Sequence, residues 1–376
     1  MTILGIETSC DETAAAVLEE KNGRVTILSN VIASSASLQS KYGGIIPEQA
    51  AREQIKSIVP VIKESLRLAS LAQGSSIELD AIAVTQGPGL IGSLLVGVET
   101  AKVLATIFEK PLIPVNHLMG HFYANWISSS SPQGRTINYS STDPAKPENG
   151  EVPSFPCIGL LVSGGHTDLV LFTDHHKYKY LGGTRDDAAG ECFDKCARLL
   201  GLPYPGGPEI SRLSKGANPA AFNLPRPMLG SKDFDFSFSG LKTAVHNVIL
   251  NEVKNPSRMR DSNELRDPSA LPQDDKANLA SSIEAAIIDC LVEKTVRAVQ
   301  EYKVEQIIVA GGVAANQNLV ERLKSEIRNF KLEIKLAVPP PYLCTDNGAM
   351  VAAAAFFLKP ITNPTKLQAD PNLSLS

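Results

Sequence analysis

Two similar stretches decide the fold of this chain: GIETSCDETAAAVL at Gly5–Leu18 and GLLVSGGHTDLVL at Gly159–Leu171. Each reads as a strand, a tight polar turn and a second strand, and Ser9 of the first matches Ser163 of the second. Polar turns favour Ser, Gly and Asp in unrelated hairpins too, so chance similarity is the alternative. We interpret the pair as a duplicated domain whose two turns face one another across a cleft.

Around the hairpins, β-rich runs alternate with helical stretches, which is the pattern of an α/β protein. A long amphipathic helix is expected to start at Pro47. Its spacing predicts a buried face made of Ile55, Val59, Ile62, Leu66 and Ala69. Residues 128–153 and 255–273 are rich in polar and turn-forming residues, which predicts two irregular segments.

The length of 376 residues suggests two domains of roughly 150 residues each. We divide the chain into an N-terminal half at residues 1–127, an irregular linker at 128–153, a C-terminal half with a helical insert at 154–358, and a tail at 359–376. The tail after Pro360 is expected to be poorly ordered, as chain ends often are.

The charge balance argues against general polyanion binding. The chain has 36 basic and 40 acidic residues, so its net charge of −4 does not attract nucleic acid. Binding of nucleic acid would need a local basic patch or a partner subunit. The opening MTILGIETSC lacks the features of a signal peptide, and no apolar run reaches the ~18 residues of a membrane span. Six scattered cysteines are expected to be reduced, so we predict a cytoplasmic protein.

The two hairpin turns are candidates for phosphate binding. Consecutive backbone N–H groups in short polar turns can converge on a phosphate oxygen, and glycine permits a close approach. The related stretch GPGLIGS at Gly87–Ser93 lacks the lysine of a Walker motif, which excludes a P-loop NTPase. The context LVSGG does not match GxSxG, so Ser163 is not indicated as a hydrolase nucleophile.

A third glycine cluster, VAGGVAANQNL at Val309–Leu319, follows an expected strand and opens a helix. Gly311 and Gly312 would let a flat ring lie against the backbone, and Asn316 is placed to hydrogen-bond a base or a ribose. The alternative is a plain strand-to-helix turn with Asn316 near the helix start. For Asp194, in GECFDKCARLLG, the residues alone favour a solvated helix carboxylate.

His117 and His121, in HLMGH, are four residues apart, so on a helix both imidazoles lie on one face, as ligation of a transition metal requires. A purely structural pair is the alternative. No glutamate follows the first histidine, which argues against a HExxH metalloprotease. Asp346, in LCTDNGAM, is the candidate third ligand, with a helix N-cap as its alternative role. A site of two histidines and one aspartate leaves positions open for substrate oxygens and suits Fe(II) or Zn(II).

Taken in order, the motifs of this chain closely resemble those of the TsaD/Kae/Gcp family, the tRNA N6-adenosine threonylcarbamoyltransferases. The motifs are GIETSCDETAAA, GGIIPEQAAREQ, TQGPGLIGSLLVG, the spaced histidines, LLVSGGHT, DDAAGECFDKCARLLGLPYPGGP, FSFSGLKTAV, VAGGVAANQNL and CTDNGAM. The resemblance runs from about Ile3 to Phe357. It implies duplicated actin-like ATPase domains (ASKHA, ribonuclease H-like) with a ligand cleft between them.

The resemblance also implies the reaction. The threonylcarbamoyl group of threonylcarbamoyl-AMP passes to N6 of adenosine 37 in tRNAs that read codons beginning with adenine, and AMP is released. Partners implied are the tRNA anticodon loop, a dimerising paralogue (TsaB-like) and a P-loop ATPase (TsaE-like). Arg258, Arg260 and Arg266 are candidate tRNA contacts, with a solvated charged loop as the alternative. The other functions considered are an actin-like ATPase or kinase and a non-catalytic scaffold paralogue.

The resemblance assigns site residues as well. One divalent metal per subunit is implied, Fe(II) favoured over Zn(II), on His117, His121 and Asp346. Substrate contacts map to Leu161, Val162, Ser163, Gly164, Gly165, Asp194, Gly207 and Asn316. Asp11 and Glu12 match acidic residues implicated in activity, and one of them is expected to take the proton of the attacking amine.

Two positions depart from the pattern of the family. Many relatives carry Glu where this chain has Met119, between the histidines, which bears on metal affinity. Many carry Asp where Ser211 stands, which puts one ribose contact in doubt.

Overall fold

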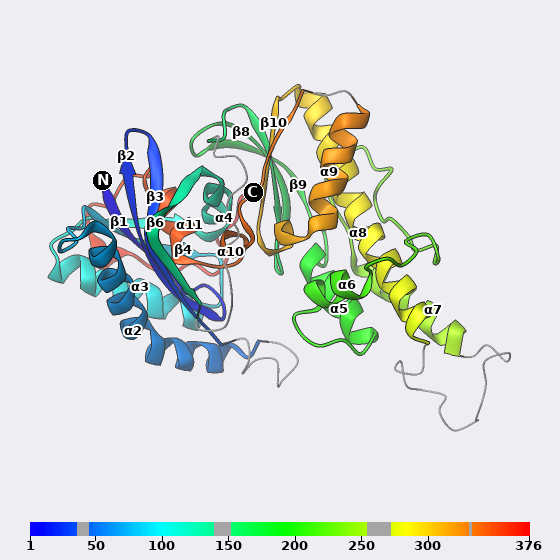
Figure 1. Ribbon diagram of the computed structural model, residues 1–376, viewed down its shortest axis with the longest axis horizontal. Coiled ribbons are helices and arrows are strands. Elements are labelled where there is room, and N and C mark those ends of the chain that lie inside the picture. The colour runs from blue at the N-terminus through cyan, green and yellow to red at the C-terminus, as the bar shows by residue number, and fades with distance from the viewer. Residues whose placement is uncertain (36–44, 139–151, 254–271, 331–332) are drawn as a thin grey trace.

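Two β-sheets lie side by side in the computed structural model, each with its own set of helices (Figure 1). The structure describes residues 1–35, 45–138, 152–253, 272–330 and 333–376. In this part of the chain, no helix is long and apolar enough to cross a membrane.

The first sheet has six strands in the order β5-β4-β1-β2-β3-β6. Their bounds are β1 Thr2–Glu7, β2 Glu12–Lys21, β3 Arg24–Ser34, β4 Ala81–Gly87, β5 Leu112–Asn116 and β6 Ile127–Asn138. β1 pairs antiparallel with β2 and parallel with β4, and β4 pairs parallel with β5. The expected hairpin is therefore the β1–β2 pair.

The second sheet repeats this topology. It has five strands in the order β11-β10-β7-β8-β9, with bounds β7 Cys157–Val162, β8 Thr167–Asp174, β9 Lys177–Gly183, β10 Gln306–Ala310 and β11 Lys335–Ala337. β7 pairs antiparallel with β8 and parallel with β10, and β10 pairs parallel with β11, as their counterparts do in the first sheet. The same order and the same strand directions confirm the predicted duplicated actin-like fold.

Helices cover both sheets. The first sheet packs with α2 Pro47–Gln73, α3 Ile91–Ile107, α4 His117–Tyr123 and α11 Gly348–Ala355. The second half carries α5 Ala189–Leu199, α6 Gly206–Leu213, α7 Ser239–Val253, α8 Gln273–Tyr302 and α9 Gln317–Asn329, and the short α10 Pro341–Cys344 precedes α11.

The core element that positions the site is α11, whose residues are all buried. This helix packs against β1, β2 and α4 although it lies near the end of the chain. Its small side chains allow a very close approach: a Cβ added at Gly5 of β1 would lie 2.4 Å from the carbonyl oxygen of Gly348. Because real Cβ atoms do not come so near to a backbone oxygen, glycine is needed at Gly5. The contact brings the segment before α11 next to the first hairpin turn.

The predicted buried face of α2 is partly wrong. Ile62 and Ala69 are buried, but Ile55 and Val59 are 65% and 50% exposed. The buried face consists of Ala50, Gln54, Ile58, Val61, Ile62, Ser65, Leu68 and Ala69. The hydrophobic pattern failed because two of these buried side chains, Gln54 and Ser65, are polar and hydrogen-bonded. A prediction from apolar residues alone therefore gives a face that is rotated around the helix axis from the observed one.

The predicted irregular segment at 128–153 is a strand over its first part. β6 pairs parallel with β3 by backbone register, from Val25↔Ile127 to Ile32↔Asn138. Ladder hydrogen bonds need only the backbone, so a strand can form without apolar periodicity in its sequence. Residues 139–151, and 254–271 of the second segment, lie outside the described part of the chain.

The tail after Pro360 is ordered, contrary to the prediction. Leu367 and Leu375 are each 5% exposed and belong to the apolar clusters on the first sheet. The backbone N–H of Asp370 donates to the carbonyl of Gln86 at 2.9 Å. Buried leucines and a long-range backbone bond hold this terminus, which the composition of the tail did not reveal.

Candidate functional site

A cavity of about 960 Å³ lies between the two halves of the chain. Both hairpin turns line it, the first with residues 9–12 and the second with residues 163–166. This confirms the prediction that the two turns share one cleft. The glycine-rich turn after β10 and the start of α6 complete the wall.

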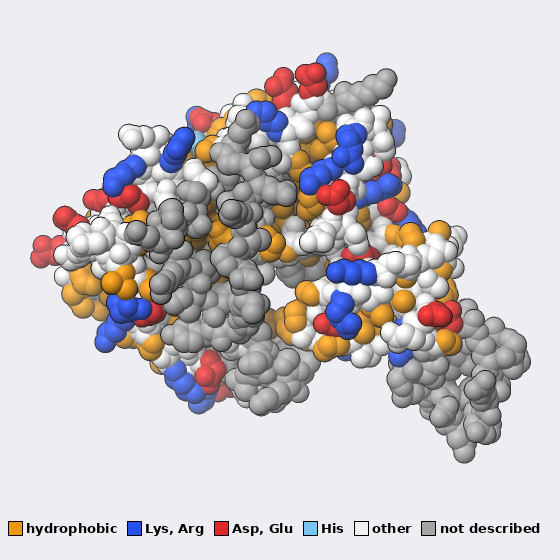
Figure 2. All heavy atoms as spheres, viewed as in Figure 1, with side chains coloured by type: hydrophobic (Ala, Val, Ile, Leu, Met, Phe, Trp, Pro, Cys, Tyr) orange, Lys and Arg blue, Asp and Glu red, His pale blue; other side chains and the backbone are white. Residues whose placement is uncertain are grey.

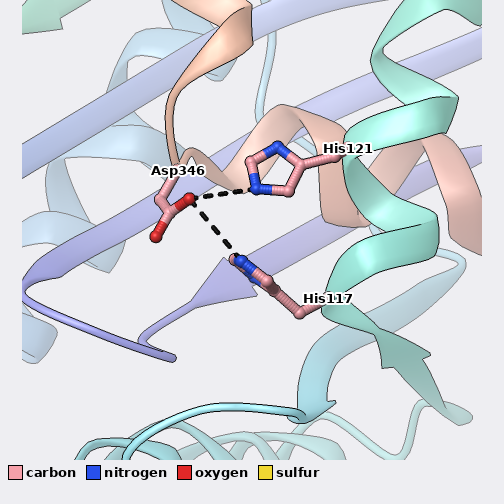
Figure 3. A group of neighbouring side chains, drawn as sticks. All are labelled: His117, His121 and Asp346. Atoms are coloured by element: carbon pink, nitrogen blue, oxygen red, sulfur yellow. Dashed lines mark ion pairs between the residues drawn. The ribbon is translucent and has the colours of Figure 1, made fainter. Parts of the chain in front are cut away.

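Three side chains from two distant parts of the chain, α4 and the segment before α11, meet at the cavity. Nε2 of His121 lies 3.2 Å from Oδ1 of Asp346, and Nε2 of His117 lies 3.6 Å from the same oxygen (Figure 3). One ligand atom from each residue fits within 4.8 Å of the others. The geometry is therefore compatible with a shared cation, as the spacing of the histidines predicts.

The donor set fits a metal ion for a second reason. Both ring nitrogens of His121 are buried and have no hydrogen-bond partner among the described residues. Nε2 is within ion-pair distance of Asp346 but lacks the angle of a hydrogen bond. A buried ring nitrogen without a hydrogen bond costs free energy, and a cation between Nε2 and Asp346 would give that nitrogen a partner.

Local sequence explains how the ligands are presented. α4 begins at His117 because the side chain of Asn116 caps it, accepting from the backbone N–H of Leu118 at 2.9 Å. Asp346 does not cap α11, since the neighbouring Asn347 accepts from the N–H of Met350 at 2.9 Å. The N-cap alternative for Asp346 is therefore wrong, and its carboxylate remains available as a ligand.

A buried carboxylate, which the sequence did not indicate, contacts the first histidine on the side away from Asp346. Oε2 of Glu7, at the end of β1, lies 3.1 Å from Nδ1 of His117, and Glu7 is completely buried. The hydroxyl of Thr85 donates to the same oxygen at 2.5 Å. A carboxylate on Nδ1 fixes the imidazole tautomer and leaves Nε2 free to bind a metal.

The electrostatics follow from these contacts. Burial lowers the pKa of His117, but the carboxylates of Glu7 and Asp346 outweigh it and raise that pKa to about 9. Burial raises the pKa of Asp346, whereas the two neighbouring imidazoles bring it down to about 2. Asp346 is thus an anion at neutral pH and able to bind a cation.

His166, in the second turn, is another cavity residue that the sequence did not single out. Burial and the nearby imidazoles of His117 and His121 lower its pKa to about 4. Its ring is therefore neutral at physiological pH. The signal was its place in the VSGGHT motif, two residues after Gly164.

The candidate catalytic carboxylates Asp11 and Glu12 both line the cavity. Burial raises the pKa of Glu12 well above its usual range, and the charge of Asp11 adds to the effect. The turn that carries them is braced from α2, because Nε2 of Gln54 donates to the carbonyls of Thr8, Cys10 and Glu12 at 2.9 to 3.3 Å. Gln54 belongs to the GGIIPEQAAREQ motif, but the sequence did not reveal its role.

The second turn presents open glycines to the cavity. A Cβ added at Gly164 or Gly165 would meet no atom within 4 Å. Ser163 serves the turn itself, since its Oγ accepts from the N–H of His166 at 3.1 Å. Leu161 and Val162 end β7 as fully buried side chains and are absent from the cavity lining. Of the predicted LVSGG contact, Ser163, Gly164 and Gly165 line the cavity, whereas Leu161 and Val162 do not.

Asp194 and Gly207 lie together at the cavity wall. Oδ1 of Asp194 accepts from the backbone N–H of Gly206 at 2.7 Å, at the start of α6. Burial raises the pKa of Asp194. The prediction of a solvated carboxylate from the residues alone is wrong, because this side chain holds the PGGP loop in place.

Asn316 caps α9, so the helix-start interpretation is right, and it also lines the cavity. Its Oδ1 accepts from the N–H of Leu319 at 3.0 Å. Its Nδ2 donates to Ser211 at 2.9 Å and to Glu284 of α8 at 2.8 Å. Glu284 is a further residue that the sequence reasoning missed.

Met119 is 4% exposed within the apolar cluster between the sheets. Arg258, Arg260 and Arg266, the candidate tRNA contacts, lie outside the described residues.

Comparison with known proteins identifies relatives over nearly the whole chain. The family model described as "TsaD: tRNA N6-adenosine threonylcarbamoyltransferase" matches residues 26–136 and 143–353. A protein of that description from Thermomicrobium roseum is 49% identical over 362 residues, covering 95% of this chain and 92% of the relative. One from Dehalococcoides mccartyi is 46% identical over 357 residues, covering 95% of this chain and 93% of the relative.

Among solved structures, full-length HypF in its phosphate- and nucleotide-bound form aligns with a TM-score of 0.53 at 11% identity. The alignment covers 95% of this chain and 46% of HypF. At this identity the likeness concerns the fold alone.

Proposed function

The chain belongs to the TsaD family of tRNA N6-adenosine threonylcarbamoyltransferases, and we propose that it carries out the transfer in the cavity between its two halves. The donor is threonylcarbamoyl-AMP and the acceptor is N6 of adenosine 37 in tRNAs that read codons beginning with adenine. The observation that carries the proposal is one cavity lined both by a His117–His121–Asp346 cluster and by the open glycines of the second turn.

The chemistry requires positioning more than a strong catalyst. N6 of adenosine attacks the carbamoyl carbon, a C–N bond forms, the bond from that carbon to the phosphate oxygen breaks, and AMP leaves. The amine is a weak nucleophile, so the acyl donor must be activated and held in line with it. An adenylate provides the activation through its leaving group, and the protein supplies orientation and charge stabilisation.

The second hairpin turn suits the phosphate of the donor, and the turn after β10 suits its adenosine. Backbone N–H groups around Gly164 and Gly165 can approach a phosphate oxygen because no side chain stands in the way. Gly311, at φ +90°, lets the turn after β10 lie against the carbonyl of Val162, so the two turns form one continuous wall. In this arrangement the adenine lies near Gly312 and the ribose near Asn316.

The cation would be held by His117, His121 and Asp346, with Fe(II) favoured and Zn(II) the alternative. When bound, a divalent ion supplies charge that polarises an acyl carbonyl and orients the oxygens of the donor. Glu7 holds His117 in the tautomer that presents Nε2 to this point.

Proton removal falls to the first turn. The raised pKa of Glu12 makes its carboxylate a stronger base than an exposed one, and the side chain lines the same cavity. We propose that Glu12 accepts the proton that N6 loses during the attack, and that the charge of the neighbouring Asp11 helps to raise the pKa of Glu12.

We propose that the first half carries a surface for a partner protein. Every fourth residue of α3 forms a row that includes Ile91, Leu95, Val103 and Ile107, each between 44% and 67% exposed. On α2, Ile55, Val59 and Leu71 are exposed at the same spacing, with Lys63 and Arg67 between Val59 and Leu71. Figure 2 shows apolar side chains at the surface where these helices lie. Exposed apolar rows at this spacing pack well against other helices. We assign the surface to a dimerising paralogue (TsaB-like), and a P-loop ATPase (TsaE-like) completes the set of partners.

Nothing in the described part of the chain favours a kinase or a scaffold function. The decisive experiment mixes purified chain, partners, labelled threonylcarbamoyl-AMP and unmodified tRNA. Label in tRNA that depends on this chain supports the proposal. Label released as free threonine or left as donor, with partners active, contradicts it.

A further inference from the structure

At the sugar end of the cavity, one buried carboxylate organises the wall. Glu284 of α8 is 3% exposed and accepts four hydrogen bonds from neutral side chains. Oε1 accepts from Ser211 at 2.6 Å and from Asn316 at 2.8 Å. Oε2 accepts from Ser214 and Asn318, both at 2.7 Å. A carboxylate has about four lone-pair sites, so Glu284 is saturated.

These bonds determine which polar atoms face the ligand. Ser211 has a single hydroxyl proton and gives it to Glu284. Asn316 gives its two amide protons to Ser211 and Glu284. What Ser211 and Asn316 retain toward the cavity is acceptor capacity, one lone pair on the Ser211 oxygen and one on Oδ1 of Asn316. Asn318 also lines the cavity and gives one of its two amide protons to Glu284.

We propose that Glu284 is the positioning residue that makes Ser211 and Asn316 accept, rather than donate, hydrogen bonds at the cavity wall, and so selects a ligand with free sugar hydroxyls. The inference rests on the proposed function only in taking that ligand to be the AMP part of the donor. A ribose supplies two hydroxyl donors, whereas a deoxyribose lacks one of them. A site built to pair with a hydroxyl rejects the analogue without it, because its own polar atom is then left unpaired.

The same geometry explains the departure at Ser211. An aspartate there would place its carboxylate against that of Glu284, where Ser211 now stands at 2.6 Å. Two like charges at hydrogen-bond distance inside a protein are strongly unfavourable. Positions 211 and 284 therefore hold one carboxylate between them, and in this chain Glu284 carries it. In place of the ribose contact expected from an aspartate at position 211, this chain has Ser211, whose hydroxyl donates to Glu284 and is polarised by it.

The test measures binding of AMP and of 2′-deoxy-AMP to the full chain by calorimetry. Glu284→Gln keeps the shape but adds an amide donor, which turns the Ser211 hydroxyl toward the cavity. We expect AMP affinity to fall about tenfold while 2′-deoxy-AMP changes little, so the preference for AMP shrinks. Ser211→Asp alone should bind AMP at least as poorly, and Ser211→Asp combined with Glu284→Gln should restore both affinity and preference.

Ser214→Ala is the matched control. Ser214 donates to the same carboxylate but does not line the cavity, so this variant should lower the melting temperature and keep the preference. An unchanged preference in a folded Glu284→Gln protein, or no rescue in the double variant, would overturn the inference. Transfer to tRNA is measured separately: loss of transfer with an intact AMP preference counts against the proposed function alone.

Discussion

Oε2 of Glu7 lies 3.1 Å from Nδ1 of His117, although the two residues are 110 positions apart in the chain. The contact connects the end of β1 to the first residue of α4, which carries both candidate histidine ligands. Because Glu7 is completely buried, its charge acts on the histidine with little screening by solvent. This pair orients the candidate metal site.

Removing that charge should weaken metal binding without removing a ligand. In Glu7→Gln, the affinity for Fe(II) or Zn(II) is expected to fall about 10- to 100-fold, the usual effect of losing an outer carboxylate on a ligating histidine. Competition with a chromophoric chelator measures it. Glu20→Gln, at the far end of the same hairpin, is the charge control and should bind as the wild type does. Equal affinities for the two variants would contradict the role of Glu7.

Metal loading should release protons and depend on pH. His117 has a pKa of about 9 without the ion, so at pH 7 its imidazole is charged and must lose a proton to ligate. Affinity should therefore rise with pH up to about 9. The metal-free fold should show the opposite trend: the raised pKa stabilises it fully below about 6.5, and this contribution is lost as pH rises through 9. Calorimetry in buffers of different ionisation enthalpy counts the protons, and no release at pH 7 would refute the assignment.

Two glycines near the second turn should respond differently to a side chain. A Cβ at Gly164 would meet no atom within 4 Å, so for Gly164→Val we expect a normal melting temperature but a loss of AMP binding. A Cβ at Gly190 would lie 2.5 Å from the carbonyl oxygen of Ser163, so Gly190→Ala should destabilise the fold itself. Thermal denaturation and AMP titration of both variants separate the cases. Undiminished AMP binding by Gly164→Val would contradict the assignment of the phosphate to this turn.

The ordered tail should contribute measurable stability. Leu375 is 5% exposed, and truncating a buried leucine typically costs about 2–5 kcal/mol, so Leu375→Ala should lower the free energy of unfolding by that amount. Leu71→Ala, at a leucine that is 63% exposed, is the control and should have little effect. Urea denaturation compares them, and equal stabilities would show that the tail does not pack as described.

The exposed row on α3 should mediate association. Val103 is 56% exposed, so Val103→Glu is expected to leave the melting temperature unchanged while it abolishes complex formation with a dimerising paralogue. Size-exclusion chromatography with light scattering measures the complex. A complex of normal affinity would assign the partner to another surface.

The sequence predicted what depends on local pattern. Both hairpins, the helix at Pro47 and the histidine pair follow from turn residues and from helical spacing, and each is present in the structure. Asp346, in the LCTDNGAM motif, is a ligand candidate by sequence, with a helix N-cap as the alternative, and the close packing of α11 on β1 brings it to the histidines.

The parts that were missed depend on contacts between distant segments. Glu7, Gln54 and Glu284 are polar residues inside a strand and two helices, where their sequence neighbours give no hint of a partner. Each acts through hydrogen bonds that only the folded chain creates. The rotated face of α2 has the same origin, because the bonds of Gln54 and not its polarity decide where it lies.

The most direct test of the account compares neighbouring residues of the CTDNGAM motif. Metal content and tRNA threonylcarbamoylation are measured for the wild type, for Asp346→Ala and for Asn347→Ala, with partners present. We predict one ion per chain in the wild type, and loss of both the ion and the transfer in Asp346→Ala. Asn347→Ala removes the cap of α11 and the bonds from Nδ2 to the carbonyls of Leu343 and Thr345, but no metal ligand, so it should lose stability and keep the ion. A metal-free Asp346→Ala protein that transfers at the wild-type rate would contradict the central claim.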